Sequence, residues 1–521
     1  MFLTRLASTR AYSEQSTAEL RLRFSFEVKE TDLLGRIGTL RVGDKTIETP
    51  YMFPVIHPVS QSVPTEQLSS MGFSGLMTNS YILYSRRRQE ALDQGLHKLL
   101  GFDGIFMTDS GGYQVLEYGD LGLSYKEVAA FQSEIGSELA VTLDRPTGYP
   151  QERRTAVQTV DYSLKNAIAT LKEFGERDTV WVGPIQGGLH PDLVRKSAAS
   201  MVNAGFEFLA LGSPVQVMEN YMFADLLKMI MAAKRSIPYS VPLHLFGAGH
   251  PLTMSLAVAL GCDTFDSASY LIFARTGRYM SRGVVMTLKS MKHLPCSCQV
   301  CTRTSVKELL ELDHPERTRL LAVHNLFILK EELESCKEAM AEGRLWDLVE
   351  ERSMAHPRLK EAFVELAKIS KELSVGTPAM KERGLFVRSV EDLARPELLM
   401  AASRLSRATR KSSKNALLTI SEDRQGRRQE RDRRGDAYNI HPVLGPYPVE
   451  LEFHYPFSQT EIGGVAPATS VEIAKKKLKR IGYATVRVKK TKRRMPVARS
   501  KSRPTRRGAS PSPRSASARP R

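Results

Sequence analysis

Phe106-Met-Thr-Asp-Ser-Gly-Gly-Tyr-Gln114 is the stretch that decides the fold, because an apolar run there ends abruptly in an acid, a hydroxyl and two glycines. A buried parallel strand that reaches a working surface ends in this way. The carboxyl group of Asp109 would then lie at the tip of the strand. The two glycines would let the chain turn tightly and let a flat ligand come close to the backbone.

Short apolar runs of the same kind alternate with amphipathic helical patterns from residue 23 to about residue 290. Such alternation is typical of an α/β fold with a parallel sheet. Eight runs in about 250 residues favour a (β/α)8 barrel, the TIM barrel. A dinucleotide-binding fold is not indicated, because no G-x-G-x-x-G follows the first strand. The runs cover residues 51–56, 75–78, 104–109, 139–144, 180–186, 206–212, 242–247 and 264–266.

Polar side chains stand at the ends of four of these runs: Asp109, Asp144, Gln186 and Asp266. The carboxyl ends of all strands meet at one mouth of a closed barrel, so these side chains are expected to face one site. Two acids on separate strands suit a reaction that needs two carboxyl groups. Simpler interpretations exist: Asp109 and Asp266 could cap the helices that follow them, and Gln186 could precede a tight turn. Their joint placement on separate strands favours the site.

A cluster of three cysteines lies within six residues, at Cys296, Cys298 and Cys301. Thiolates at this spacing suit tetrahedral Zn²⁺, which needs a fourth ligand. His324 opens an apolar helical segment and is the best candidate, with His293 and His314 as competitors. Three thiols and one imidazole leave no open position, so the metal is expected to be structural. The alternative is three reduced cysteines without metal, and five cysteines in so long a chain indicate a reducing compartment.

The charge of the chain is strongly uneven. The 521 residues carry a formal net charge of +18, and the 48 residues from 474 onward contain 19 Lys or Arg and no Asp or Glu. Removing those 19 charges leaves −1 for residues 1–473, so the body of the protein is near neutral. A basic block of this kind is typical of an arm that binds a polyanion, RNA in particular, and the alternative is a solubility tail.

Composition also predicts how the chain is divided into domains. A boundary is expected near Gly376, so that residues 23–375 form the barrel domain, with the zinc-binding subdomain inserted at 291–330. Residues 376–490 are expected to form a small α+β region that contains a flexible linker at 403–436, with one short strand within it at 416–420. The linker is inferred from its richness in Arg, Ser and Asp.

The two ends of the chain differ from its body in composition. Residues 491–521 are low in complexity and basic, so a disordered tail is expected there. Residues 1–22 are an N-terminal extension that weakly resembles an organellar presequence, although an ordinary extension is favoured. We find no stretch of about 18 uncharged apolar residues, so no membrane-spanning helix is expected.

Several motifs together resemble the tRNA-guanine transglycosylase family, and in particular its archaeal type. The resemblance covers residues 23 to about 490. It implies a glycosyltransferase, more narrowly a pentosyltransferase, that exchanges guanine at position 15 in the D-arm of tRNA for 7-cyano-7-deazaguanine, a step in archaeosine biosynthesis. The shared motifs are Thr108-Asp-Ser-Gly-Gly-Tyr-Gln-Val115, Leu143-Asp144, Gln186-Gly-Gly188, Leu211-Gly-Ser-Pro-Val-Gln-Val-Met-Glu219, Phe265-Asp-Ser267 and Cys-x-Cys-x2-Cys followed by a histidine.

The resemblance also implies a role for each site residue. Asp266 corresponds to the family's nucleophile and Asp109 to its general acid and base, although Asp109 has also been described as the nucleophile. One structural zinc ion per chain is implied on the cysteine and histidine ligands. The implied partners are tRNA, 7-cyano-7-deazaguanine, guanine and a second copy of the chain in a homodimer, in the cytoplasm and without a membrane. The residues that correspond to the base-binding set are Ser110, Asp144, Gln186, Gly212 and Ser213.

The chemistry of base exchange fits two carboxyl groups. Replacing one nucleobase by another on the same anomeric carbon retains its configuration, which is most simply two successive inversions. The first needs a nucleophile for the ribose, here Asp266, and the second needs a base that takes a ring proton, here Asp109. A carboxylate and a carboxamide, Asp144 and Gln186, can hydrogen-bond the edge of a guanine-like ring. The guanine is stacked inside tRNA and must be flipped out to reach them.

Three alternatives stay open at this point. The exchange could take place at the anticodon wobble position, with queuine or its precursor as the incoming base. The chain could be a non-catalytic tRNA-binding paralogue, although such a protein would be expected to have lost its acids. A barrel glycosidase acting on carbohydrate would not need the cysteines or the basic arm. One departure is clear: the archaeal family usually ends in an RNA-binding domain of the PUA type, and a basic tail follows residue 490 here.

Overall fold

The computed structural model describes residues 23–112, 122–408, 411–421, 435–463 and 469–491, and these form two compact units. The first unit contains the described residues up to 408 together with 453–463. The second contains the described residues of 411–452 and 469–491. Residues 1–22 and 492–521, which hold the expected N-terminal extension and nearly all of the expected tail, lie outside the described residues.

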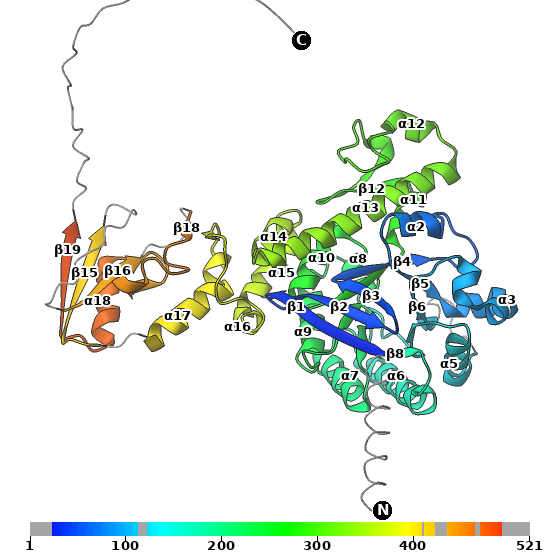
Figure 1. Cartoon of the computed structure of the whole chain (residues 1–521), viewed down its shortest axis with the longest axis horizontal. Coiled ribbons are helices and arrows are strands. Elements are labelled where there is room, and N and C mark those ends of the chain that lie inside the picture. The colour runs from blue at the N-terminus through cyan, green and yellow to red at the C-terminus, as the bar shows by residue number, and fades with distance from the viewer. Residues whose placement is uncertain (1–22, 113–121, 409–410, 422–434, 464–468, 492–521) are drawn as a thin grey trace, which may run out of the picture. The chain divides into compact units, whose positions relative to one another are not determined.

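Eight parallel strands of the first unit close into a barrel, which Figure 1 shows surrounded by helices. Each strand coincides with one of the apolar runs in the sequence, so the predicted (β/α)8 barrel is confirmed. Neighbours in sequence are neighbours in space all the way round. The strands are β4 (Tyr51–Ile56), β5 (Gly75–Asn79), β6 (Ile105–Asp109), β7 (Leu139–Val141), β8 (Val180–Ile185), β9 (Phe208–Leu211), β10 (Leu243–Leu245) and β11 (Thr264–Ser267).

Helices follow the strands and cover the outside of the barrel (Figure 1). Both faces of a strand such as β8 are therefore buried, which is why it reads as an unbroken apolar run. None of the helices among the described residues combines the length and the apolar character that crossing a membrane requires. The helices are α2 (Thr65–Ser70), α3 (Ser80–Leu100), α5 (Tyr125–Glu134), α6 (Arg153–Phe174), α7 (Pro191–Ala204), α8 (Val215–Glu219), α9 (Phe223–Lys234), α10 (Pro251–Ala259) and α11 (Ser269–Arg275).

A three-stranded antiparallel sheet closes the amino-terminal end of the barrel. Its side chains join those that fill the barrel in one apolar cluster, where Phe24 stacks on Phe208 with ring centroids 5.9 Å apart. A buried ion pair between Arg36 and Asp263 ties the sheet to the residue before β11. Packing thus seals this end, and the polar strand ends lie at the opposite end. The strands of the sheet are β1 (Phe24–Asp32), β2 (Gly35–Val42) and β3 (Lys45–Thr49).

The expected zinc-binding subdomain, residues 291–330, lies within a longer segment that follows α11 directly. This segment begins with an antiparallel pair of strands, continues through a loop that holds the three cysteines, and ends on a long helix. That helix, α13, then packs against β4 and β1 of the barrel unit. The elements are β12 (Arg278–Met280), β13 (Val285–Thr287), η1 (Leu288–Ser290), α12 (Val306–Glu311) and α13 (His314–Ala341), followed by α14 (Leu345–Ser353), α15 (Pro357–Lys368) and α16 (Ser370–Leu373).

The chain after α16 remains part of the first unit for some distance. Strand β14 (Leu385–Val387) pairs in parallel with β18 (Thr460–Ile462). The 3-10 turn η2 (Glu391–Ala394) and helix α17 (Pro396–Ala408) belong to the same unit. The division between the compact units therefore falls near residue 409, later than the boundary expected at Gly376. Residues 403–408, expected as the start of a linker, are the last turns of α17.

The second unit is a small α+β fold. Its four-stranded sheet has the order β17-β16-β15-β19, and the buried side chains of helix α18 pack against it. The strand that the sequence predicts at 416–420 is present as β15. The elements are β15 (Asn415–Ser421), β16 (Asp436–His441), β17 (Gly445–Pro448), η3 (Val449–Leu451), α18 (Val471–Arg480) and β19 (Thr485–Thr491).

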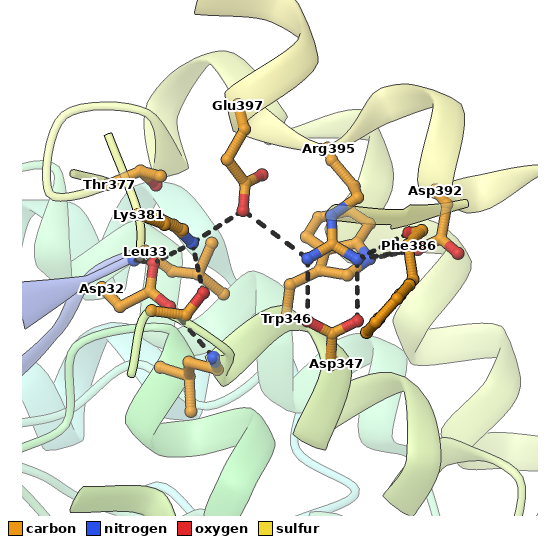
Figure 2. Close-up of polar contacts among 12 residues, drawn as sticks. Asp32, Leu33, Trp346, Asp347, Thr377, Lys381, Phe386, Asp392, Arg395 and Glu397 are labelled. Atoms are coloured by element: carbon orange, nitrogen blue, oxygen red, sulfur yellow. Dashed lines mark hydrogen bonds and ion pairs between the residues drawn. The ribbon is translucent and has the colours of Figure 1, made fainter. Parts of the chain in front are cut away.

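A cluster of buried charges joins the segment 381–397 to the barrel domain (Figure 2). Lys381 lies between Asp32 at the end of β1 and Glu397 at the start of α17, with N–O distances of 3.0 Å and 2.6 Å. Arg395 forms a two-pronged pair with Asp347 of α14, with N–O distances of 2.8 Å and 2.9 Å. Water reaches these side chains hardly at all, so each charge depends on its partner. This dependence explains why the segment stays with the first unit.

We predict that Arg395→Met lowers the free energy of unfolding by about 3 kcal/mol, because the buried Asp347 would lose its two-pronged partner and keep only the half-exposed Arg388. Urea unfolding followed by circular dichroism measures the change. Arg358→Met is the matched control, since the pair of Arg358 with Glu361 is exposed to water. Exposed pairs contribute about 0–1 kcal/mol. Equal losses in the two variants would contradict the prediction.

Candidate active site

The barrel brings the predicted polar residues to its carboxyl end. Asp109 is the last residue of β6, and Asp266 lies in β11. Asp144 follows β7 by three residues, and Gln186 directly follows β8. Parallel strands of a closed barrel end at the same mouth, so side chains far apart in sequence meet there. The motif that begins at Thr108 continues into residues 113–115, which lie outside the described residues.

A chain of hydrogen bonds links four of the predicted base-binding residues. Ser110 Oγ donates to Asp144 Oδ1 at 3.3 Å, and Gln186 Nε2 donates to Asp144 Oδ2 at 2.7 Å. Ser213 Oγ donates to Gln186 Oε1 at 2.9 Å. The backbone N–H of Thr147 donates to the same oxygen at 3.0 Å. These bonds assign the amide of Gln186, because its oxygen accepts from Ser213 and Thr147 and its nitrogen donates to a carboxylate.

Two glycines allow the backbone to approach these side chains closely. A Cβ on Gly212 would lie 2.2 Å from Gln186 Nε2, and a Cβ on Gly112 would lie 2.3 Å from Asp144 Oδ1. Any larger residue at either position would displace the hydrogen-bonded pair. Ser213 has a φ of +65°, which turns the chain directly after Gly212. All the base-binding residues that the sequence predicts are therefore in one place.

Asp109 is held by donors from two sides. Asn79 Nδ2 donates to Asp109 Oδ2 at 2.8 Å, and the backbone N–H of Gly111 donates to Oδ1 at 2.9 Å. Burial is the main cause of a raised pKa of about 6 for Asp109; the negative charge of Asp266 also raises it, and these hydrogen bonds lower it. A carboxyl group with such a pKa can both give and take a proton near neutral pH.

Asp144 has a pKa that is raised still more, to about 7. The main cause is burial, and the charge of Asp109 adds to it, while the hydrogen bonds from Gln186 and Ser110 oppose it. The three acids stand at the carboxyl ends of β6, β7 and β11 of one closed barrel, and the charges of Asp266 and Asp109 accordingly contribute to the raised pKa values of Asp109 and Asp144. The arrangement can therefore hold a proton at the mouth of the barrel.

Asp266 has two donors on a single oxygen. His244 Nε2 lies 3.1 Å from Asp266 Oδ1, and the backbone N–H of Gly247 donates to that oxygen at 2.7 Å. Neither His244 nor Asn79, which holds Asp109, is among the site residues predicted from the sequence. The signal for His244 is a lone polar side chain within the apolar run at 242–247. Asn79 also caps α3, because its side chain accepts a hydrogen bond from the N–H of Ile82. A helix cap is a sufficient reason for an asparagine at this position, so the sequence gives no separate signal for its contact with Asp109.

The cysteine cluster and His324 converge as predicted. Their ligand atoms all lie within 4.8 Å of one another, so the group can hold a metal ion. His324 Nε2 contacts the carbonyl oxygen of Met280 at 2.9 Å, which leaves Nδ1 facing Cys298 and Cys301 at 3.5 Å and 3.4 Å. The competing His314 contacts the carbonyl oxygen of Arg275 instead. Three sulfur donors and one nitrogen donor form a complete tetrahedral set.

One cavity lies away from all of these residues. It has a volume of about 170 Å³ and opens near the amino-terminal ends of β4 and β5, between them and α13. Tyr51, Phe73, Lys330 and Lys337 are among the side chains that line it. None of the predicted site residues lines this cavity. The candidate active site is therefore the group of polar residues at the carboxyl end of the barrel, and not this cavity.

Comparison with known proteins agrees with this arrangement. The family model described as queuine tRNA-ribosyltransferase matches residues 31–358. A tRNA-guanine(15) transglycosylase of Sulfolobus acidocaldarius is 36% identical over 473 residues, which are 89% of this chain and 94% of that protein. One from Aeropyrum pernix is 41% identical over 73% of this chain and 75% of its own length. One from Thermococcus kodakarensis is 39% identical over 84% of this chain and 71% of its own length.

The match and the barrel together place the chain among the ribosyltransferases. The chain belongs to the tRNA-guanine transglycosylase family. The resemblance read from the sequence motifs is thereby confirmed.

The raised pKa of Asp144 predicts a pH-dependent stability. The folded protein holds this proton more tightly than the unfolded chain, so the stabilisation is complete below about pH 4 and is lost as pH rises to about 7. Asp144→Asn does not ionise and avoids this loss. Its free energy of unfolding, relative to the wild type, should therefore rise between pH 4 and pH 8, by up to about 4 kcal/mol.

Asp192→Asn is the control for this experiment, and the sign of its effect is opposite. The guanidinium of Arg153 lowers the pKa of Asp192 to about 2 by hydrogen bonding. This variant should lose stability relative to the wild type as pH rises from about 2 to about 4. Urea unfolding at constant ionic strength measures both variants. A pH-independent difference for Asp144→Asn would show that Asp144 is ionised throughout.

Proposed function

We propose that this protein exchanges guanine at position 15 in the D-arm of tRNA for 7-cyano-7-deazaguanine, a step in archaeosine biosynthesis. The observation that carries the proposal is the meeting of Asp109, Asp144 and Asp266 at one barrel mouth. The similarity to tRNA-guanine(15) transglycosylases over most of the chain supports the choice of position and base. A non-catalytic paralogue is disfavoured, because all three acids are present.

The reaction proceeds by double displacement. A carboxylate oxygen of Asp266 attacks C1′ of the ribose, the bond from C1′ to guanine breaks, and Asp109 gives a proton to the departing guanine. The ribose is then held as an ester of Asp266. Asp109, now ionised, takes the ring proton of the incoming base, whose nitrogen attacks C1′ and releases the carboxylate of Asp266. One proton leaves Asp109 and one returns, so the enzyme ends as it began.

The base is read by the network around Asp144. Asp144 and Gln186 present a carboxyl group and a carboxamide side by side, and such a pair matches the donor and acceptor edge of guanine and of a deazaguanine. Ser110 and Ser213 hold the pair from either end. Gly212 lets the backbone come close to the carboxamide of Gln186, so that this group stays beside Asp144. The flipped guanine and its replacement therefore use the same pocket.

The metal on the cysteine cluster is zinc in this proposal, one ion per chain, with a structural role. The donor set of three thiolates and one imidazole is the one that zinc prefers, and it leaves no position for substrate. Thiolate ligands require a reducing compartment, so we place the enzyme in the cytoplasm. As in its family, the active form is a homodimer that makes contact through this subdomain.

We predict that purified protein incorporates labelled 7-cyano-7-deazaguanine into unmodified tRNA, and that nucleoside mapping finds the label at position 15. Asp266→Asn should reduce incorporation by at least about a thousandfold, because the nucleophile is lost. Its affinity for tRNA should stay within about twofold, since electrostatic contacts to phosphates are unchanged. Asp93→Asn, on the outer helix α3, is the matched control and should be fully active.

The outcomes separate the competing functions. Label at the anticodon wobble guanine would favour the queuine-type exchange, and no label on any tRNA would overturn the proposal. Trapping the covalent complex without incoming base, followed by peptide mapping, identifies the nucleophile. If the ribose is found on the peptide that contains Asp109, then Asp109 is the nucleophile and Asp266 is the general acid and base.

A second prediction concerns the metal. His324→Ala should lose the zinc, of which the wild type should hold about one ion per chain, and should melt at a lower temperature. His293→Ala is the control, because His293 is exposed and lies outside the cluster. Elemental analysis by mass spectrometry and calorimetry measure both variants. Full zinc content in His324→Ala would refute the ligand assignment.

A further inference from the structure

The imidazole of His244 contacts two residues of the neighbouring strand, β11, one of which is the candidate nucleophile Asp266. His244 lies in β10, is completely buried, and is the register partner of Thr264 in β11. Its Nδ1 lies 2.9 Å from Thr264 Oγ1, and its Nε2 lies 3.1 Å from Asp266 Oδ1. Residues 264 and 266 of a strand point to the same face, so one ring can reach both. The ring therefore bridges a strand residue inside the barrel and the acid at its rim.

The partners of the ring fix its tautomer. A carboxylate only accepts hydrogen bonds, so Nε2 must carry the hydrogen that points at Asp266. In the neutral ring Nδ1 is then an acceptor, and the hydroxyl of Thr264 is its donor. Aromatic side chains pack round the imidazole, with ring centroids 4.9 Å away at Phe246 and 6.3 Å away at Phe53. The packing keeps the ring from turning away from the acid.

The two oxygens of Asp266 are not equivalent. His244 and the backbone N–H of Gly247 both donate to Oδ1, at 3.1 Å and 2.7 Å. No donor reaches Oδ2 from the part of the chain that the structure describes. The lone pairs of Oδ1 are therefore engaged by its two donors. Oδ2 has its lone pairs available to attack an electrophilic carbon.

We propose that His244, anchored by Thr264, is a positioning residue that commits Oδ1 of Asp266 to hydrogen bonds and leaves Oδ2 as the attacking atom. The inference rests on the proposed function, in which Asp266 is the nucleophile. In the ester intermediate Oδ2 is bonded to C1′ and Oδ1 is the carbonyl oxygen, so both donors keep their acceptor. When the second displacement breaks the bond from Oδ2 to C1′, the same donors stabilise the charge that returns to the carboxylate.

The test compares His244→Phe with His244→Gln. Phenylalanine fills the space without a donor, and we expect kcat for labelled-guanine exchange to fall by about 10- to 100-fold, the value of one hydrogen bond to a charged group. The KM for tRNA and for the base should stay within about twofold, because neither touches His244. Glutamine can place an amide N–H near the position of Nε2 and should restore most of the rate. An unchanged kcat in His244→Phe would overturn the inference.

Two further variants keep the test decisive. His97→Phe breaks the same kind of contact, to Glu138 at 2.7 Å, near the amino-terminal end of the barrel, and should leave kcat unchanged. If His244→Phe fails to fold, Thr264→Val decides, because it keeps the imidazole and removes its hydroxyl anchor. A lower kcat at constant KM supports the inference, and an unchanged kcat overturns it. A fall in kcat as large in His97→Phe would also overturn it, since the effect would then be one of general stability.

Asp266→Asn, measured in parallel, separates this inference from the proposed function. An inactive Asp266→Asn beside a fully active His244→Phe would refute the positioning role alone. An active Asp266→Asn would refute the nucleophile, and with it the basis of the inference.

Discussion

The closure of eight parallel strands into one barrel is the constraint on which the rest of this structure depends. It forces the carboxyl ends of β6, β7 and β11 to one mouth, and with them Asp109, Asp144 and Asp266. Carboxyl groups that are buried together resist ionisation, and this is visible in the raised pKa values of Asp109 and Asp144. The crowding keeps a proton available where the proposed reaction has to move one.

Each acid is distinguished by its donors, although all three are aspartates in one site. Asp109 has the amide of Asn79, Asp144 has the amide of Gln186, and Asp266 has the imidazole of His244. In these surroundings the pKa of Asp109 is raised to about 6 and that of Asp144 to about 7, whereas both donors to Asp266 reach the same one of its oxygens. The different roles proposed for the three carboxyl groups therefore follow from the surrounding strands and not from the residue type.

Parts of the molecule outside the barrel are held by a different principle. In the subdomain after α11, three thiols and an imidazole converge in a group that can hold a metal ion, and the segment 381–397 is held by the ion pairs of Lys381 and Arg395 (Figure 2). Both add a few strong, directional contacts to the apolar packing around them. Such contacts tolerate little change, whereas the apolar packing of the barrel tolerates conservative substitution.

Local patterns in the sequence were enough to predict the barrel, the acids at its mouth and the four residues that can hold a metal ion. Apolar runs, strand ends and cysteine spacing are short-range features, and the fold places them by rules that apply to every closed barrel. Asn79 and His244 were not recognisable, because a helix cap and a lone histidine in a strand have common structural explanations. The boundary between the two compact units was also not recognisable from the sequence. It depends on the pairing of β14 with β18, which lies about 75 residues later in the chain.

By itself, the sequence therefore determined which elements form and which chemical groups stand at their ends. Only the tertiary structure decided which donor faces which carboxyl oxygen, and that Lys381 is paired with Asp32, 349 residues away. The physical reason is that hydrogen bonds and ion pairs act over about 3 Å in space and leave no periodic trace along the chain.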